Sequence, residues 1–350
     1  MAQGTLDDDI DLRRRALFRS AAGLAVSAAL ALPATRAAFS AAPEATETAW
    51  GDPATLVSAV GAGTLAAISV AQTIEAYTNG FGYVVHWRGN VPKESAELWG
   101  VPAMAGRDAA VLGPPDFNRG MIRVLELGKD FKETSLQATL GWVALEIHVK
   151  SPEEVVTQLK GKPFTHTGGP GNADDGAGAP LYRAAQFKGP SGEPLYMTQH
   201  LQLDKLISAG RNNVGPLFIQ TLNTYPYEPT REFYQQTLGM KMRMEVKTRR
   251  DNGARMSAVR ATEYCSIQID EFGANTPQRP ASPGCFAAGV NMCTLTTRAL
   301  DPVKAALTKA NVKFTEVTSN ACPPFKGSRG LYLLGRGGER LEIMQVAGAL

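Results

Sequence analysis

The sequence carries almost no excess charge of either sign. Its 36 lysines and arginines nearly balance 33 aspartates and glutamates, which leaves a formal net charge of +3. Basic residues are dense only near the N-terminus, at Arg13, Arg14 and Arg15. Because a polyanion needs a large positive field to hold it, we expect no nucleic-acid partner.

Cysteine is scarce as well. The four cysteines all lie in the last third of the chain, and their spacing matches no CxxC or Cys/His zinc motif. Two alternatives stay open: disulfides in an oxidising compartment, or small buried apolar side chains. The four residues are Cys265, Cys285, Cys293 and Cys322.

Long hydrophobic runs are also missing. The longest, from Ser20 to Leu32, falls short of the ~20 apolar residues of a membrane span. Arginines precede it and an Ala-rich segment follows it, which is the order of a signal peptide and resembles a twin-arginine signal. We therefore predict a signal at 1–42, a linker at 43–55, and a periplasmic or secreted protein with no stable membrane insertion. An uncleaved N-terminal anchor is the alternative.

What the sequence does contain is a repeat. Beyond the linker one plan occurs four times: a strand, an amphipathic helix that ends near a glycine, and three strands joined by Gly/Pro turns. An unrelated α+β fold with evenly spaced strands is the alternative. The expected elements are 65–70, 72–78, 83–87, 94–99, 108–112 and 121–127; 142–149, 151–159, 183–187 and 194–198; 217–222, 232–237, 242–246, 256–260 and 265–269; and 290–296, 301–311, 313–317, 331–334 and 340–345.

One such unit exposes an apolar sheet face and must pair with another. Consecutive units pair with the shortest connections, so we expect two domains, 56–205 and 206–350. A length of 350 residues with 44% hydrophobic residues is enough for two buried cores.

Four segments resemble the vicinal oxygen chelate superfamily, which includes glyoxalases, dioxygenases and bleomycin-resistance proteins. AYTNGFG at 76–82 and FYQQTLG at 233–239 look like the helix ending FY…LG of that family. GPSGEPLYMT at 189–198 and GRGGERLEIM at 335–344 look like its closing hairpin DPDGxxIEL. The resemblance covers nearly all of the chain after the linker. It implies an α+β fold of four βαβββ modules, which form two domains with curved mixed sheets.

The resemblance also implies where a site would lie. In this fold, inward residues of the first and last strands of each unit converge on a cavity, and metal-dependent members place His, Gln or Glu there. Here a divalent metal would find an incomplete set of ligands. Glu342 alone matches the family's carboxylate, and Gln220 is a weaker second ligand whose register is uncertain by one residue.

The alternation of the strand at 142–149 turns Leu145 and Ile147 towards the helix and Glu146 and His148 towards the cavity. A carboxylate in an apolar cavity has a raised pKa, which suits a general base or acid. The alternative is that Glu146 and His148 satisfy each other in the core or face solvent at a sheet edge. The predicted catalytic residues are Glu126, Glu146, His148 and Tyr196, and the predicted cavity wall adds Trp142, Thr198 and His200.

Two histidines are interpreted differently. His86 lies in an aromatic strand, where we expect a core or surface histidine. His166 lies beside the Gly-rich segment 168–178, which no Lys-Ser/Thr follows, so that it is not a phosphate loop. We expect this segment to be a connection or a lid.

Together these features favour an exported glyoxalase-like enzyme that acts on a small hydrophobic or aromatic carbonyl compound. Lyase, isomerase or epimerase, and dioxygenase chemistry all stay open, because a fold does not select one reaction. The alternative is a metal-free protein of the bleomycin-resistance type that binds or sequesters a small molecule. The expected partner is a small-molecule ligand, and a homodimer is left open.

Overall fold

The computed structural model of the chain describes residues 54–174, 180–201, 213–247, 255–262 and 264–346. The predicted signal, most of the linker and the predicted boundary between 205 and 206 lie outside these residues. Among the described residues, no helix has the length and hydropathy needed to cross a membrane.

The four predicted units are present, each with the order strand, helix and three strands. Additional short helices are α3 (Lys93–Leu98) and η2 (Pro102–Met104) within unit 1, and η3 (Gly128–Asp130) and η4 (Leu136–Ala138) between units 1 and 2. Unit 1 consists of β1 (Val60–Ala67), α2 (Val70–Phe81), β2 (Val84–Asn90), β3 (Asp108–Gly113) and β4 (Met121–Glu126). Unit 2 consists of β5 (Gly141–Val149), α4 (Pro152–Gln158), β6 (Thr165–Asp174), β7 (Pro180–Lys188) and β8 (Pro194–His200). Unit 3 consists of β9 (Val214–Thr224), α6 (Tyr227–Glu232), the π-helix η5 (Phe233–Thr237), β10 (Lys241–Lys247), β11 (Arg255–Thr262) and β12 (Cys265–Glu271). Unit 4 consists of β13 (Gly289–Thr297), α7 (Leu300–Lys309), β14 (Phe314–Val317), β15 (Gly330–Leu334) and β16 (Arg340–Gln345).

Two elements differ from the sequence prediction. The first strand ends at Ala67, because Ser69 already caps helix α2 by accepting a hydrogen bond from the backbone N–H of Gln72. The Gly-rich segment predicted as a loop is largely strand β6, which pairs with β7 through register shifts at Gly168 and Gly171. Glycine tolerates the irregular backbone of such bulges, so a Gly-rich sequence does not by itself exclude a strand.

The strands form two eight-stranded sheets, and neither sheet joins unit 1 to unit 2 or unit 3 to unit 4. The order β14-β15-β16-β13-β1-β4-β3-β2 joins units 1 and 4, and β10-β11-β12-β9-β5-β8-β7-β6 joins units 2 and 3. We call these the 1–4 sheet and the 2–3 sheet. Antiparallel pairing of β1 with β13 and of β5 with β9 forms the two seams. The predicted pairing of units 1 with 2 and 3 with 4 is therefore wrong for the strands.

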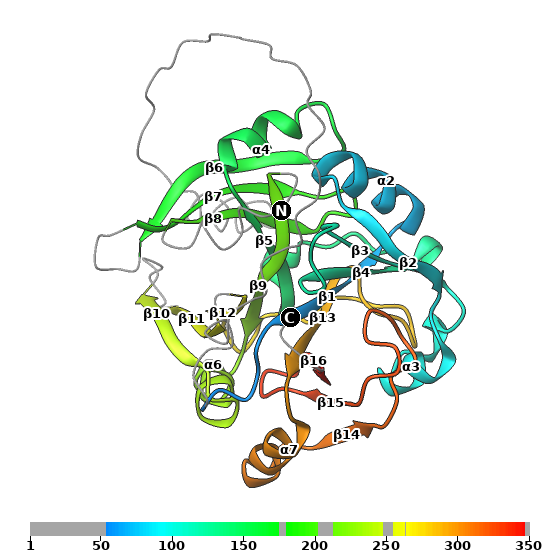
Figure 1. Cartoon of the computed structure of the whole chain (residues 1–350), viewed down its shortest axis with the longest axis vertical. Helices are drawn as coiled ribbons and strands as arrows, with labels where there is room; N and C mark the ends of the chain where they lie inside the picture. Colours follow the sequence, from blue (N-terminus) through cyan, green and yellow to red (C-terminus); the bar gives the residue numbers. More distant parts are fainter. Residues whose placement is uncertain (1–53, 175–179, 202–212, 248–254, 263, 347–350) are drawn as a thin grey trace, which may run out of the picture.

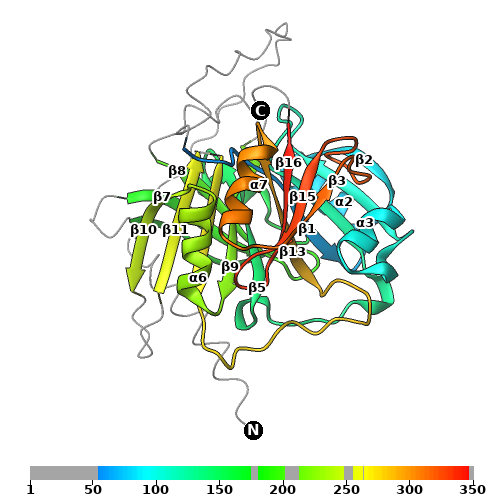
Figure 2. The same ribbon diagram turned by 90° about the horizontal axis from the view of Figure 1, so that it is seen from below.

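The two sheets pack back to back at their central strands. Figures 1 and 2 show β5 and β9 beside β1 and β13, with the helices on the outer sides of this junction. The approach is close at Gly63, where a Cβ atom would lie 2.7 Å from the side chain of Leu145 and 2.9 Å from that of Leu217. The faces that meet here and under the helices form one apolar core, and we call them the helix faces. The opposite face of each sheet is its inner face.

Units 1 and 2, and likewise units 3 and 4, are joined through a helix of one unit instead. The Tyr77 hydroxyl of α2 donates a hydrogen bond to Glu193 Oε1 at 2.8 Å, which links unit 1 to unit 2. The Tyr234 hydroxyl donates to Glu339 Oε1 at 2.9 Å, which links unit 3 to unit 4 in the same way. Burial raises the pKa of both carboxyl groups to about 7.

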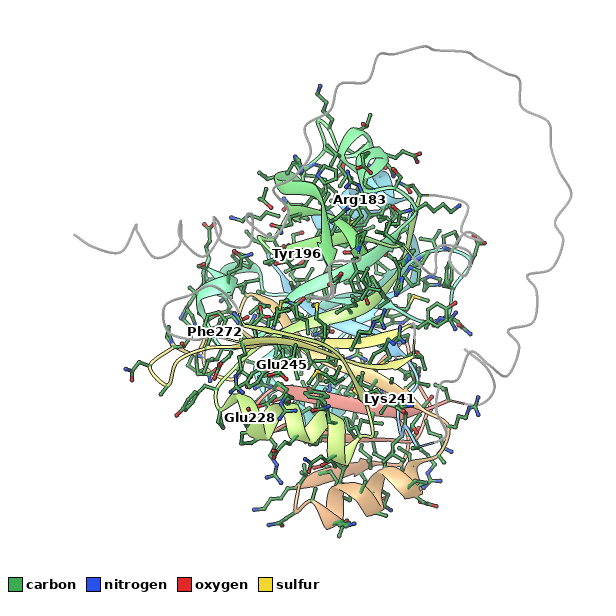
Figure 3. All side chains as sticks on the ribbon, turned by 90° about the vertical axis from the view of Figure 1, so that its left-hand side faces the viewer. Arg183, Tyr196, Glu228, Lys241, Glu245 and Phe272 are labelled. Carbon is green, nitrogen blue, oxygen red and sulfur yellow. The ribbon has the colours of Figure 1, made fainter. Side chains whose placement is uncertain are left out.

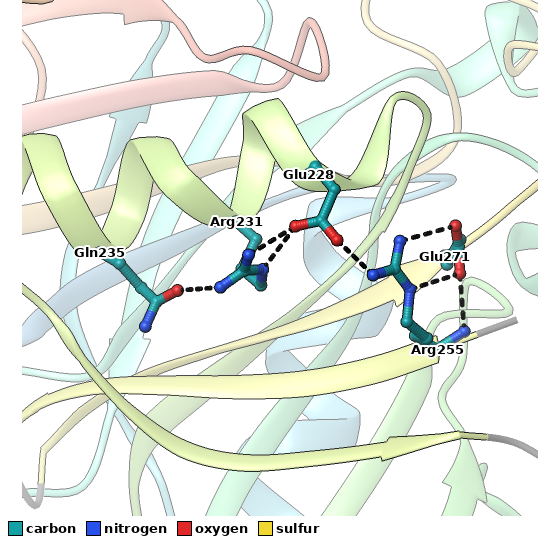
Figure 4. A network of polar contacts seen from close by, with 5 residues as sticks. All are labelled: Glu228, Arg231, Gln235, Arg255 and Glu271. Atoms are coloured by element: carbon teal, nitrogen blue, oxygen red, sulfur yellow. Dashed lines mark hydrogen bonds and ion pairs between the residues drawn. The ribbon is translucent and has the colours of Figure 1, made fainter.

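A polar network fixes α6 on the outer strands of unit 3. Figure 3 views the molecule from the side on which β10 lies, with Glu228 and Glu245 labelled in its lower half. Glu228 accepts hydrogen bonds from Arg231 and Arg255, and Arg255 also donates to Glu271 (Figure 4). The network therefore ties the short helix to β11 and β12.

The twin Tyr–Glu hydrogen bonds give a paired test of the unit contacts. Tyr77→Phe and Tyr234→Phe should each lower the free energy of unfolding by about 1–3 kcal/mol, because each leaves a buried carboxyl without one of its donors. Urea unfolding measures this. Tyr225→Phe is the control, since Tyr225 is 48% exposed and should be tolerated. An effect of Tyr77→Phe no larger than that of Tyr225→Phe would mean that the bond is not structural.

Candidate functional site

The inner face of each sheet has a centre built from four matched positions. Each first strand contributes the residue six places before its helix begins: Thr64 before Val70, Glu146 before Pro152, Thr221 before Tyr227 and Thr294 before Leu300. Each lies directly opposite one residue of the parallel closing strand. These partners are Arg123, Tyr196, Gln268 and Glu342. The repeat thus places two equivalent centres in one chain.

The centre of the 1–4 sheet is occupied by an internal ion pair. Arg123 and Glu342 have no exposed side-chain surface, and their closest N–O distance is 3.0 Å. Arg123 also donates to Thr64 Oγ1 at 3.2 Å and to the carbonyl of Pro323 at 2.9 Å. Glu342 accepts from Thr294 at 2.7 Å and from the Trp99 indole at 2.8 Å. Both charges are therefore paired and hydrogen-bonded.

Apolar side chains cover this centre. Trp99, Phe286 and Cys322 pack in one cluster, and Phe325 packs in a second cluster on the same inner face. The guanidinium of Arg123 lies 5.2 Å from the Trp99 ring. All four cysteines of the chain are free and buried, which is the second of the two alternatives that the sequence left open. The 1–4 centre is thus a packed and internally satisfied part of the structure.

The centre of the 2–3 sheet is different, because its four matched positions hold one carboxylate, Glu146, which forms no ion pair with the described residues. Glu146 is 8% exposed on β5, and burial raises its pKa to about 7. The nearby Thr198 hydroxyl opposes this shift, although its Oγ1 makes no hydrogen bond of normal geometry with the described residues. Glu146 is therefore poised to change protonation state near neutral pH.

His148 lies two residues further along β5, opposite Thr198 of β8. It is fully buried and meets the Phe218 ring edge-on, with 5.3 Å between ring centroids. Neither of its ring nitrogens has a hydrogen-bond partner among the described residues, and the same holds for Thr221 Oγ1. Burial lowers the pKa of His148 to about 3, so the ring is neutral. Buried polar atoms without partners are costly and mark a place where another molecule can bond.

Tyr182 and His200 extend this inner face towards unit 3. Their rings meet edge-on at 4.8 Å, and Tyr182 approaches Phe218 at 6.5 Å. Burial raises the pKa of Tyr182 to about 12, with Glu146 adding to the rise, so the phenol keeps its proton. Burial, together with the positive charges of Arg243 in β10 and Arg260 in β11, lowers the pKa of His200 to about 4. The same two charges oppose the rise in the pKa of Tyr182.

The structure brings together five of the residues predicted from the sequence. Figure 3 shows Tyr196 in the half of the molecule that unit 2 occupies, across from Lys241 and Glu245 of β10. The residues that share the inner face of the 2–3 sheet are Glu146, His148, Tyr196, Thr198 and His200.

Three predicted residues lie elsewhere. Glu126 is on the helix face of the other sheet, where Oε2 accepts a hydrogen bond from the backbone N–H of Val70 at 3.2 Å and so caps helix α2. Gln220 points between the sheets and donates to the carbonyl of Met292 at 3.2 Å. Trp142 lies in the shared core and donates to the carbonyl of Arg340. The predictions of Glu126 as a catalytic group, Gln220 as a metal ligand and Trp142 as a cavity residue are therefore wrong.

Several inner-face residues were missed by the sequence prediction. Thr221 was detectable, because it has the same spacing to its helix as Glu146. The position of Gln268 could be predicted only after β12 had been placed beside β9, where Gln268 lies opposite Thr221. Arg243 and Arg260 had no local signal, since they meet unit 2 only through the pairing of β5 with β9.

The residues at the two centres do not fit a divalent metal. In the 1–4 sheet a guanidinium already neutralises Glu342. In the 2–3 sheet one carboxylate stands with an amide, a hydroxyl and a phenol, and a phenol is a poor ligand for Mg²⁺-like ions at neutral pH. Within the described residues, no group of three His, Cys, Asp or Glu side chains converges. The predicted ligands Glu342 and Gln220 do not approach a common point, because they lie in different sheets.

Solved structures share the fold of this chain. Glyoxalase I from Zea mays superposes with a TM-score of 0.56 at 15% sequence identity, covering 82% of this chain and 92% of that one. A candidate dioxygenase from Bacillus subtilis gives 0.59 at 12% identity, covering 83% and 86%. No family model matches the sequence, and no curated protein matches it. The comparisons thus show that this chain shares the fold of these two proteins.

The ion pair of the 1–4 centre can be tested by a double-mutant cycle. Arg123→Met and Glu342→Leu should each lower the free energy of unfolding by about 3–5 kcal/mol, because each leaves an unpaired buried charge. The double variant should lose much less than the sum of the two. Chemical denaturation measures the three values. Lys93→Met, at an exposed pair with Glu97, is the control and should change little. Additive losses would show that the two side chains are not coupled.

His148 provides a test that depends on pH. Its folded-state pKa of about 3 lies below the ordinary histidine value of 6.5, so between these values the unfolded state binds a proton that the folded state does not. Wild-type stability should therefore fall as pH decreases from 6.5, by roughly 1.4 kcal/mol per pH unit for this group. His148→Leu should remove that part of the decline. Thr73→Val is the control, because the buried Thr73 hydroxyl donates to the carbonyl of Ser69 at the start of helix α2, and its offset from the wild type should be equal at pH 7.5 and pH 5.

Proposed function

We propose that the chain is an enzyme that moves a proton beside the carbonyl group of a small hydrophobic or aromatic compound, at the inner face of the 2–3 sheet. One contrast supports this site. The 1–4 centre is satisfied by Arg123 and Glu342, whereas the matched 2–3 centre has Glu146 with a raised pKa beside buried polar atoms that lack partners. Export behind residues 1–42 belongs to the same proposal and rests on the sequence alone.

Glu146 is the base in this scheme. Its carboxylate removes a proton from the carbon next to the carbonyl group, which leaves an enolate with negative charge on the substrate oxygen. Tyr182 keeps its proton at neutral pH and donates a hydrogen bond to that oxygen. Return of the proton from Glu146 to a carbon of the enolate gives an isomer or epimer, and no electron acceptor is needed.

The neutral side chains around Glu146 have a separate role. His148 and Thr198 offer hydrogen-bonding atoms to a polar substituent of the compound, while Phe218 and Tyr182 supply ring faces and edges for its apolar part. The surrounding burial keeps the pKa of Glu146 near neutrality. Glu146 thus transfers the proton, and the neutral side chains around it bind the compound.

The test follows hydrogen exchange on a simple probe. Phenylacetone in D₂O loses its CH₂ signal in the proton NMR spectrum as deuterium enters beside the carbonyl group. Glu146→Gln should slow the protein-catalysed exchange by at least roughly 100-fold, because the amide is not a base. In the wild type, the rate should rise with pH through about 7, as Glu146 becomes ionised.

Glu126→Gln is the matched control, since it makes the same chemical change at the helix cap of the other sheet. Its exchange rate should equal that of the wild type. Equal rates for Glu146→Gln and the wild type, or no exchange above background with any of the proteins, would overturn the enzymatic proposal. Such an outcome with retained binding would favour a protein that binds or sequesters small molecules.

A further inference from the structure

The inner face of the 2–3 sheet carries two arginines on the side opposite Glu146. Arg260 alternates with Val259 and Ala261, which lie in the shared core, so its side chain is on the inner face. Arg243 follows Met242 at a register shift of β10. Arg243 Nε is buried and has no hydrogen-bond partner among the described residues. Both arginines therefore bring positive charge to this face.

These arginines belong to the same site as the unpaired polar atoms. The Arg243 guanidinium hydrogen-bonds the Tyr182 side chain, and both arginines interact with Tyr182 and His200 across the two ends of the curled sheet. Tyr182 is also within range of the Glu146 carboxyl group. Tyr182 therefore connects the carboxyl group of unit 2 with the guanidinium groups of unit 3.

Two acids of unit 3 neighbour these arginines in the sheet. Asp270 shares the inner face with Gln268, from which it accepts a hydrogen bond at 3.0 Å, and it lies opposite Met256, four residues along β11 from Arg260. The charge of Glu245 raises the pKa of Tyr227 in α6, which places Glu245 on the helix face. In the 1–4 sheet, by contrast, the buried guanidinium of Arg123 forms an ion pair with the carboxylate of Glu342.

From this arrangement we infer that the 2–3 centre takes an organic anion, a carbonyl compound with a carboxylate next to the carbonyl group, and that Arg243 and Arg260 bind the carboxylate. The inference rests on the proposed function for the position of the carbonyl group. Guanidinium groups match a carboxylate with paired hydrogen bonds, and such charged bonds are stronger in a partly buried site. The carboxylate would then lie at the arginines and the carbonyl oxygen at Tyr182, with the adjacent carbon towards Glu146.

Two probes that differ only in the anionic group test the inference. Phenylpyruvate carries a carboxylate where phenylacetone carries a methyl group. Calorimetric titration of the wild-type protein should give a Kd for phenylpyruvate roughly 10- to 100-fold lower than that for phenylacetone. Arg243→Gln combined with Arg260→Gln should remove this preference, so that the two Kd values become equal. Arg243→Lys, which keeps the charge, should retain part of it.

Arg88→Gln is the control, because Arg88 is exposed on β2 of the other sheet and should not affect the preference. Equal affinity of the wild type for both probes, or a preference that survives the double Arg→Gln change, would overturn the anion site. Phenylacetone exchange that depends on Glu146 would still stand in that case. Conversely, an arginine-dependent preference without any exchange would retain the anion site and reject the enzymatic proposal.

Discussion

The packing of the two helix faces against each other is the constraint on which the rest of the structure depends. Four half-sheets each have one apolar face, and a single core buries all four. Contact is so close at Gly63 that a Cβ atom there would force the side chains of Leu145 and Leu217 to move. Because those faces are buried in the core, the polar residues of the central strands lie on the two inner faces. The position of every candidate site residue follows from that separation.

The two inner faces show how one repeat can acquire two roles. Matched positions hold Thr64, Arg123, Thr294 and Glu342 in one sheet and Glu146, Tyr196, Thr221 and Gln268 in the other. The first set neutralises itself, and a cover of apolar side chains is compatible with such a network. The second set has an acid that forms no ion pair with the described residues and, in Thr221, a buried hydroxyl without a hydrogen-bond partner among them. This is the condition expected of a site that meets a ligand.

Local patterns predicted the elements well and the contacts between units poorly. The strand expected at 340–345 is β16 itself, and the alternation at 142–149 placed Glu146 and His148 on the correct face. Glu126 was wrong because the residue equivalent to Glu342 is Arg123, an odd number of positions away and hence on the opposite face. Gln220 was wrong because its neighbour Thr221 holds the inner-face position, so Gln220 points to the opposite face. Trp142 was wrong because the register shift between Trp142 and Ala144 in the pairing of β5 with β9 interrupts the alternation. Neither this shift nor the choice of partner unit is encoded in any single segment.

The seam between the first and last units has a consequence for how the chain is made. Strand β1 pairs with β13 and β4 lies beside it, so the first unit to be synthesised finds its sheet partner only in the last one. Units 2 and 3 can assemble earlier, whereas the 1–4 sheet must wait until unit 4 has been translated. During that interval the edge of β1 is unprotected, and a nascent chain would benefit from a chaperone that shields it.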